Sequence, residues 1–250
     1  MTLTLLQRNI AWKQPEANRR STEQAMLCAP QSDLYLLPEM WATGFATTPQ
    51  GIAEEDGGES LAWMKHMAGR LDAAVAGSLV VRVGEGFRNR FYFVKPNGEV
   101  SHYDKHHLFT YGGEHRHFEA GDSRVVVAWR GVRFRLAVCY DLRFPTWLRN
   151  HEDYDALLCV ASWPASRIDA WRTLLKARAI ENQAYVCGVN RVGDDPTCHY
   201  AGASAFVDPY GHATECEGEQ EASLTVVLDG GRLRSFREKF PVLKDRDIMM

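Results

Sequence analysis

The feature that most constrains the fold of this chain is a series of short apolar runs separated by turn residues. Runs of this length, rich in Val, Leu and aromatic residues, are typical of strands. They lie at residues 2–7, 33–37, 73–83, 90–94, 125–129, 132–138, 156–160, 185–189, 204–207 and 223–228. Turn sequences at 96–98 (Pro-Asn-Gly), 130–131 (Arg-Gly) and 208–211 (Asp-Pro-Tyr-Gly) predict hairpins between neighbouring strands.

Segments with helical periodicity lie between these runs. They span residues 15–27, 59–71 and 169–184. In the last segment, a face of small and apolar residues could pack closely on a sheet or on another helix: Ala170, Thr173, Leu174, Ala177 and Ala184. Hairpins combined with crossover helices predict an α/β protein with mixed sheets. The periodicity alone leaves open whether there is one sheet or two.

Composition and charge narrow the class of protein. The 250 residues are 45% hydrophobic and 24% charged, which is ordinary for a globular protein. No repeat or low-complexity linker divides the chain, so we expect a single domain over 1–250. The formal net charge of −3 argues against a nucleic acid or an acidic membrane as partner. The basic residues of 232–246 are interleaved with acids and are interpreted as a solvated face or tail.

The N-terminus and the cysteines favour a cytoplasmic location. The first residues lack the pattern of a signal peptide, and no apolar stretch approaches the roughly 20 residues that span a bilayer. The six cysteines are far apart and form no C-x-x-C pair, which predicts reduced thiols. Cys159 and Cys187 lie in apolar runs and are expected in the core.

Three strands end at a residue able to take part in catalysis. Glu39 follows the run at 33–37 after Pro38, Lys105 lies in the sequence YDKHHLF, and Cys139 comes directly after the run at 132–138. Amide hydrolysis needs a nucleophile, a base for its proton and a positive group for the carbonyl oxygen as it becomes anionic. We expect Cys139 as nucleophile, Glu39 as base and Lys105 beside the oxyanion, together with the backbone N–H of Tyr140.

Each of these residues also has an ordinary structural interpretation. A cysteine at a strand end is commonly a packing residue, a glutamate after proline a turn residue, and a lysine a surface charge. The combination is more specific. The sequences PEMWATGF, YDKHHLF and CYDLRFP resemble the glutamate, lysine and cysteine motifs of the nitrilase superfamily of carbon–nitrogen hydrolases. Their order and their separations are those of the family, and the resemblance covers essentially the whole chain.

The resemblance implies a fold, a site and a reaction. The implied fold is a four-layer α-β-β-α sandwich, usually paired as a homodimer, and Glu114 matches the second glutamate of the family. The motifs favour the omega-amidase branch, which hydrolyses 2-oxoglutaramate or 2-oxosuccinamate to the 2-oxo diacid and ammonia through a cysteine thioester. Other amidases of the superfamily, acting on N-carbamoyl amines or deaminated glutathione, stay open as alternatives.

An omega-amidase substrate carries a carboxylate, for which arginines are suitable partners. Arg143, Arg116 and Arg167 are candidates, although Arg143 could instead pair with Asp141. The expected pocket walls, any of which could equally be core aromatics, are Phe45, Tyr111 and Trp163.

Two other classes of function are less favoured. The histidines at 102, 106, 107, 115 and 117 suggest a metal, but no H-E-x-x-H or C-x-x-C motif accompanies them, so neither a metal nor another cofactor is expected. A non-catalytic binding subunit is disfavoured because Glu39, Lys105 and Cys139 are all present.

Overall fold

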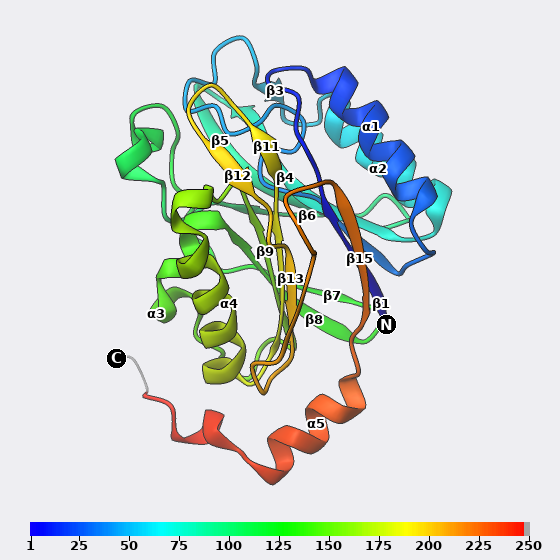
Figure 1. The fold of residues 1–250 in the computed structure, drawn as a ribbon, viewed down its shortest axis with the longest axis vertical. Helices are drawn as coiled ribbons and strands as arrows, with labels where there is room; N and C mark the ends of the chain where they lie inside the picture. The colour runs from blue at the N-terminus through cyan, green and yellow to red at the C-terminus, as the bar shows by residue number, and fades with distance from the viewer. Residues whose placement is uncertain (248–250) are drawn as a thin grey trace.

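The computed structural model describes residues 1–247 and places their strands in two large sheets and one small hairpin (Figure 1). The first sheet has the order β15-β1-β2-β4-β5-β6, with β3 beside β4, and the second has the order β14-β13-β10-β9-β8-β7. The strands of the first sheet are β1 (Thr2–Gln7), β2 (Leu34–Leu36), β3 (Glu54–Glu55), β4 (Ala74–Val83), β5 (Gly86–Val94), β6 (Val100–Asp104) and β15 (Ala222–Val227). The remaining strands are β7 (Val126–Trp129), β8 (Val132–Val138), β9 (Ala156–Ala161), β10 (Tyr185–Asn190), β13 (Ala205–Val207) and β14 (Ala213–Glu215) of the second sheet, and β11 (Val192–Asp194) and β12 (His199–Ala201) of the hairpin.

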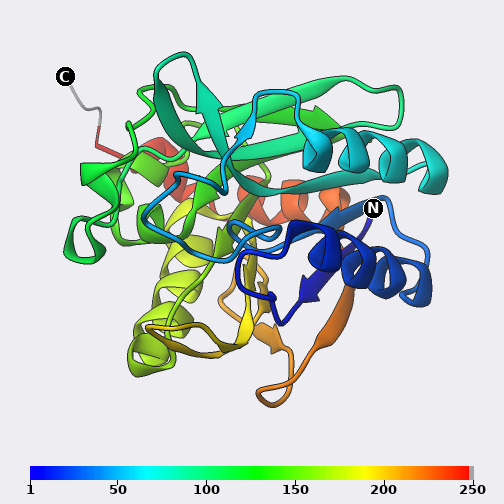
Figure 2. The same cartoon turned by 90° about the horizontal axis from the view of Figure 1, so that it is seen from above.

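Helices cover the outer face of each sheet, which confirms the predicted α-β-β-α sandwich. The helices are α1 (Pro15–Cys28), α2 (Glu59–Leu71), α3 (Pro145–Leu148), α4 (Ile168–Asn182) and α5 (Gly230–Lys239). Helices α1 and α2 lie on the side of the first sheet, and α4 lies on the opposite side of the molecule, against the second sheet (Figures 1 and 2). Short 3₁₀ turns join several of these elements: η1 (Thr110–Gly112), η2 (Glu114–Arg116), η3 (Cys139–Arg143), η4 (Ala165–Arg167) and η5 (Val242–Asp245).

The apolar residues form three layers that match this architecture. Leu34 and Leu36 of β2 face the second sheet across the central core, whereas Tyr35 between them faces α1 and α2. In the second sheet, Leu136 of β8 enters the central core and Ala137 contacts the layer under α4. Strands buried on both faces are apolar at nearly every position. This is why the runs were recognisable in the sequence.

The predicted face of the last long helix is only partly correct, because Ala170 and Leu174 are partly buried against the layer under α4 and Ala184 is buried there, but Thr173 is exposed. Trp171, Leu175 and Ala179 are the apolar residues of α4 that pack on the sheet, whereas Ala170 and Thr173 are half-buried or exposed. Gly188 of β10 explains the choice, because a side chain there would meet Trp171 and Leu175 at under 3 Å. The two bulky residues fill the space that this glycine leaves.

Several elements were not predicted from the sequence, among them β3, β6, β11, β12, β14, α3 and α5. The segment at 232–246 is more than a solvated tail, because it folds largely into α5 and η5 and buries Leu233 and Leu243. Cys159 and Cys187 are fully buried, as predicted. Across residues 1–247, no helix has the length and apolar character needed to cross a membrane.

The topology brings distant loops to one end of the sandwich. Strands β2 and β4 are parallel, and β6 has the same direction because β5 is antiparallel to both of its neighbours. Residues after the carboxyl ends of β2 and β6 therefore meet at one edge of the first sheet. In the second sheet, β8, β9 and β10 are parallel, so the loops that follow them also share an edge.

Candidate active site

Glu39, Lys105 and Glu114 form a fully buried ionic cluster at this edge. The Lys105 ammonium donates to Glu39 Oε1 and to Glu114 Oε2, each at 2.9 Å. Burial opposes the charge on Lys105, but the carboxylates of Glu114 and Glu39 outweigh it and raise the pKa of the ammonium. Burial also raises the pKa of the Glu114 carboxyl. Nearby Glu39 raises this pKa further, whereas Lys105 lowers it. The structure therefore brings together Glu39, Lys105 and Glu114, which were expected in the site as the base, the oxyanion partner and the second glutamate.

Donors from several loops satisfy the remaining carboxylate oxygens. The backbone N–H of Ser162, after β9, donates to Glu39 Oε2 at 2.9 Å, and that of Phe109 donates to Glu114 Oε2 at 2.6 Å. The side chain of Asn89, on β5, donates to both carboxylates. Neither Asn89 nor Ser162 was identified in the sequence.

Cys139 stands at the junction between β8 and η3. Its φ is +45°, a left-handed backbone conformation that is uncommon for a side chain other than glycine and frequent at functional sites. The turn directs the residue into a pocket that it lines. Burial and the Glu39 carboxylate raise the pKa of the Cys139 thiol well above its ordinary value, although Lys105 acts in the opposite direction. The raised pKa favours the neutral thiol, so a base must remove the thiol proton during attack.

Asp141 fixes the turn that carries Cys139. Its Oδ2 accepts the Val138 N–H at 3.0 Å and the Tyr103 hydroxyl at 2.7 Å. Its Oδ1 accepts both the backbone N–H and the ring nitrogen of His107, each at 2.9 Å. The cysteine turn is thereby tied to the loop that follows Lys105. The alternative pairing of Arg143 with Asp141 is wrong. These four contacts occupy the Asp141 carboxylate, and the Arg143 guanidinium lies over the ring of Trp163.

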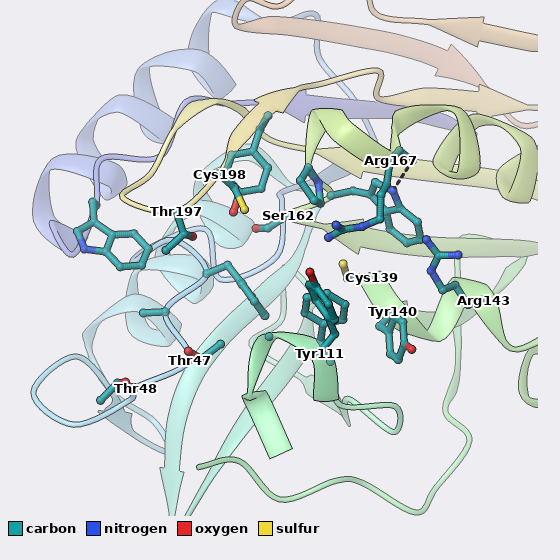
Figure 3. Close-up of a pocket in the computed structure, with 18 of the residues that line it drawn as sticks. Thr47, Thr48, Tyr111, Cys139, Tyr140, Arg143, Ser162, Arg167, Thr197 and Cys198 are labelled. Carbon is teal, nitrogen blue, oxygen red and sulfur yellow. Dashed lines mark hydrogen bonds between the residues drawn. The ribbon is translucent and has the colours of Figure 1, made fainter. Parts of the chain in front are cut away.

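Cys139 opens into a pocket of about 350 Å³ (Figure 3). Within residues 1–247, the charged side chains that line it are all cations, namely Lys13, Arg143 and Arg167. The Arg143 guanidinium stacks over Trp163 at 4.8 Å and that of Arg167 over Phe109 at 5.5 Å. Aromatic faces hold guanidinium groups without neutralising them. The pocket thus offers positive charge near the thiol and suits an anionic ligand.

The predicted pocket residues gather around this cavity. Phe45, Tyr111, Tyr140, Arg143 and Trp163 all line it. Tyr111 is 87% exposed and stands at the surface, whereas Trp163 is buried.

Other candidates lie elsewhere. Arg116 is exposed and does not line the pocket. His106 and His107 stack on Trp147 and Phe144, each at 3.7 Å between ring centroids. No cluster of potential metal ligands occurs in the part of the chain that the structure describes.

Comparison with known proteins gives consistent matches over almost the entire chain. The family model described as carbon-nitrogen hydrolase matches residues 2–238. Omega-amidase YafV from Yersinia enterocolitica is 46% identical, covering 99% of this chain and 97% of that protein. The 2-oxoglutaramate amidase of Bacillus subtilis is 34% identical, covering 98% and 96%. The solved structure of XC1258 from Xanthomonas campestris, described as a CN-hydrolase superfamily protein with an arsenic adduct in the active site, gives a TM-score of 0.97 at 41% identity and covers 100% of this chain and 98% of that one.

The raised pKa of Glu114 implies that the free energy of unfolding depends on pH. The unfolded carboxyl loses its proton near its ordinary pKa of about 4.3, whereas the folded one retains it to higher pH. This term stabilises the fold at low pH and is lost as the pH rises through the folded pKa. Glu114→Gln keeps the shape and removes the term. We therefore expect the free energy of unfolding of the variant, relative to the wild type, to rise from about pH 4 to neutral pH.

Urea unfolding at a series of pH values measures this difference. Glu217→Gln, at an exposed residue, is the control and should give a flat difference over the same range. A flat or falling difference for Glu114→Gln would show that the buried carboxylate has no net cost in the folded protein.

Proposed function

Because this chain belongs to the carbon–nitrogen hydrolase family, we propose that it is a cysteine-dependent omega-amidase, which converts 2-oxoglutaramate or 2-oxosuccinamate to the 2-oxo diacid and ammonia. The observation that carries the proposal is the charge of the pocket around Cys139. Lys13, Arg143 and Arg167 line it, and no acidic side chain does so in the described part of the chain. An amide with a carboxylate at its far end fits this charge, and an amide with an ammonium there does not.

The buried cluster supports a two-step reaction. Glu39 removes the thiol proton, the Cys139 sulfur bonds to the amide carbon, and Lys105 and the Tyr140 N–H stabilise the oxyanion. The C–N bond then breaks, and the proton held by Glu39 leaves with ammonia, which gives a thioester. Glu39 next takes a proton from water, whose oxygen attacks the thioester carbon. The C–S bond breaks, the diacid is released and the thiol recovers its proton.

The first test of this mechanism concerns the nucleophile and its partners. Cys139→Ala should abolish measurable turnover, because the thioester can no longer form. Lys105→Ala should lower kcat by ~10²–10³, the usual effect of removing one oxyanion donor. Ammonia release under saturating substrate measures both effects, with circular dichroism to check folding. Cys198→Ala, at the other cysteine that lines the pocket, is the matched control and should stay active. Turnover by Cys139→Ala would rule out the thiol mechanism.

A second prediction concerns substrate choice. We expect kcat/KM to be highest for 2-oxoglutaramate in its open-chain form, lower for succinamate and lowest for glutamine. Glutamine carries an ammonium at the end where the arginines lie, and a desolvated ammonium without an acidic partner is costly. Ammonia release across this panel, extended to carbamoyl amines and deaminated glutathione, measures the order. Equal turnover of glutamine and 2-oxoglutaramate would contradict the assignment and leave the amidase chemistry in place.

The two pocket arginines can be tested within the same assay. Arg143→Met and Arg167→Met keep an extended side chain over the aromatic rings and remove the charge. Each should lower kcat/KM for 2-oxoglutaramate by ~10–100-fold, mainly through KM, because a charge-assisted contact to the carboxylate is lost. Arg116→Met, outside the pocket, is the control and should match the wild type.

We also propose that the protein forms a homodimer. An exposed apolar patch over α4, α5 and the β13–β14 turn contains Ile180, Tyr210 and Phe240, each 48–58% exposed. Phe236 connects the last two, with its ring 4.2 Å from that of Tyr210 and 6.3 Å from that of Phe240. Exposed apolar patches of this kind are typical of association surfaces.

The double variant Ile180→Asp/Phe240→Asp should convert the dimer to a monomer, because each carboxylate would be buried at the interface without a partner. Light scattering after size-exclusion chromatography measures the mass. Leu27→Asp, at an exposed apolar residue of α1, is the control and should remain dimeric. A wild-type monomer, or a double variant that stays dimeric, would contradict this interface.

A further inference from the structure

Asn89 contacts all three members of the buried ionic cluster. The register of β5 and β6 places it opposite Lys105, whose backbone N–H donates to the Asn89 carbonyl at 3.0 Å. The side-chain amide donates through Nδ2 to Glu39 Oε1 at 2.8 Å and to Glu114 Oε1 at 3.1 Å. Only 1% of the residue is exposed, so water does not compete for these contacts.

The orientation of this amide follows from charge. Its Oδ1 is buried and has no hydrogen-bond partner among the residues that the structure describes. The reverse orientation would place that oxygen against two carboxylates, which can accept a hydrogen bond but cannot donate one while ionised. An unsatisfied buried oxygen destabilises the fold. The cluster gains two charge-assisted hydrogen bonds from this arrangement.

A neutral donor is the appropriate group between these two carboxylates. A second cation here would stabilise the ionised form of Glu39 so strongly that its ability to take a proton would fall. A third carboxylate would repel both glutamates. The amide donates a hydrogen bond to each carboxylate and adds no formal charge, so it holds both groups in place without a second cation that would oppose proton transfer to Glu39.

We propose that Asn89 is a positioning residue that holds the Glu39 carboxylate toward Lys105 by hydrogen bonding, and that it thereby sets the lower pH limit for activation of Cys139. The proposal rests on the roles given above to Glu39 and Cys139. Without the amide, Glu39 would hold its proton to higher pH, and the thiol would lack a base over part of the working range.

Alkylation of Cys139 by iodoacetamide tests this directly, because it requires no substrate and reports removal of the thiol proton. The rate is followed at the Cys139 peptide by mass spectrometry between about pH 4 and pH 9. The acidic limb of the pH–rate profile is the range in which the alkylation rate rises with pH. For Asn89→Leu, of similar volume, this limb should move upward by about one pH unit. For Asn89→Thr, which suits a strand and keeps one hydroxyl donor, the shift should be smaller but in the same direction. This second variant decides the matter should Asn89→Leu fail to fold.

Asn182→Leu is the matched control. Asn182 is a fully buried residue of α4. Its side-chain amide donates a hydrogen bond to the Arg178 carbonyl and accepts one from the Asn150 N–H. Its replacement should lower the unfolding midpoint and leave the acidic limb unchanged. An unmoved limb in a folded Asn89 variant would overturn the proposal and assign Asn89 a purely structural role. A wild-type limb in Glu39→Gln would instead refute Glu39 as the base, so the two failures are distinguishable.

Discussion

The structure depends on the burial of three charges, the carboxylates of Glu39 and Glu114 and the ammonium of Lys105. Ions removed from water are costly unless each is matched by charge and by hydrogen bonds. Here the additional donors are Asn89 and the N–H groups of Phe109 and Ser162. These donors come from both sheets, so the cluster is satisfied only when the sandwich is closed. The site and the fold are therefore specified by the same contacts, and a sheet displaced by one residue would leave a buried charge without its partner.

Much of the sandwich could be predicted from the sequence because its central strands are buried on both faces. The run at 2–7 and that at 132–138 coincide with β1 and β8 residue for residue. Edge elements carry no such signal. Strand β6 (Val100–Asp104) contains Ser, His and Asp and is mostly half-buried, and β14 (Ala213–Glu215) is largely exposed. Helix α5 buries a single residue, Leu233, so its sequence resembles that of a solvated tail.

The residues of the candidate site could be predicted where they stand in short sequence motifs. They could not be predicted where their position depends on the register of paired strands. Glu39, Lys105 and Cys139 stand in motifs that can be identified one at a time, and the structure brings the buried Glu39–Lys105 pair close to Cys139, which lines the pocket. Asn89 stands in no motif. The position of Asn89 follows from the hairpin at 96–98. The register that pairs Arg90 with Asp104 places Asn89 opposite Lys105 when it is extended by one residue. This position can be predicted from the sequence only when the lengths of both strands are known.

Conservation of charge explains why such a cluster can perform chemistry while it is buried. Counted with both glutamates ionised, Lys105 protonated and the thiol neutral, the cluster has a net charge of −1. In the proposed reaction, transfer of the Cys139 proton to Glu39 leaves that sum unchanged and moves the negative charge from the carboxylate to the sulfur, then to the oxyanion beside Lys105. No step creates a new net charge away from water, which would be the expensive event in a site of low dielectric constant. Under the proposed function, the pocket cations bind the substrate carboxylate and the buried cluster acts on the amide, so binding and bond breaking are assigned to separate groups of charges.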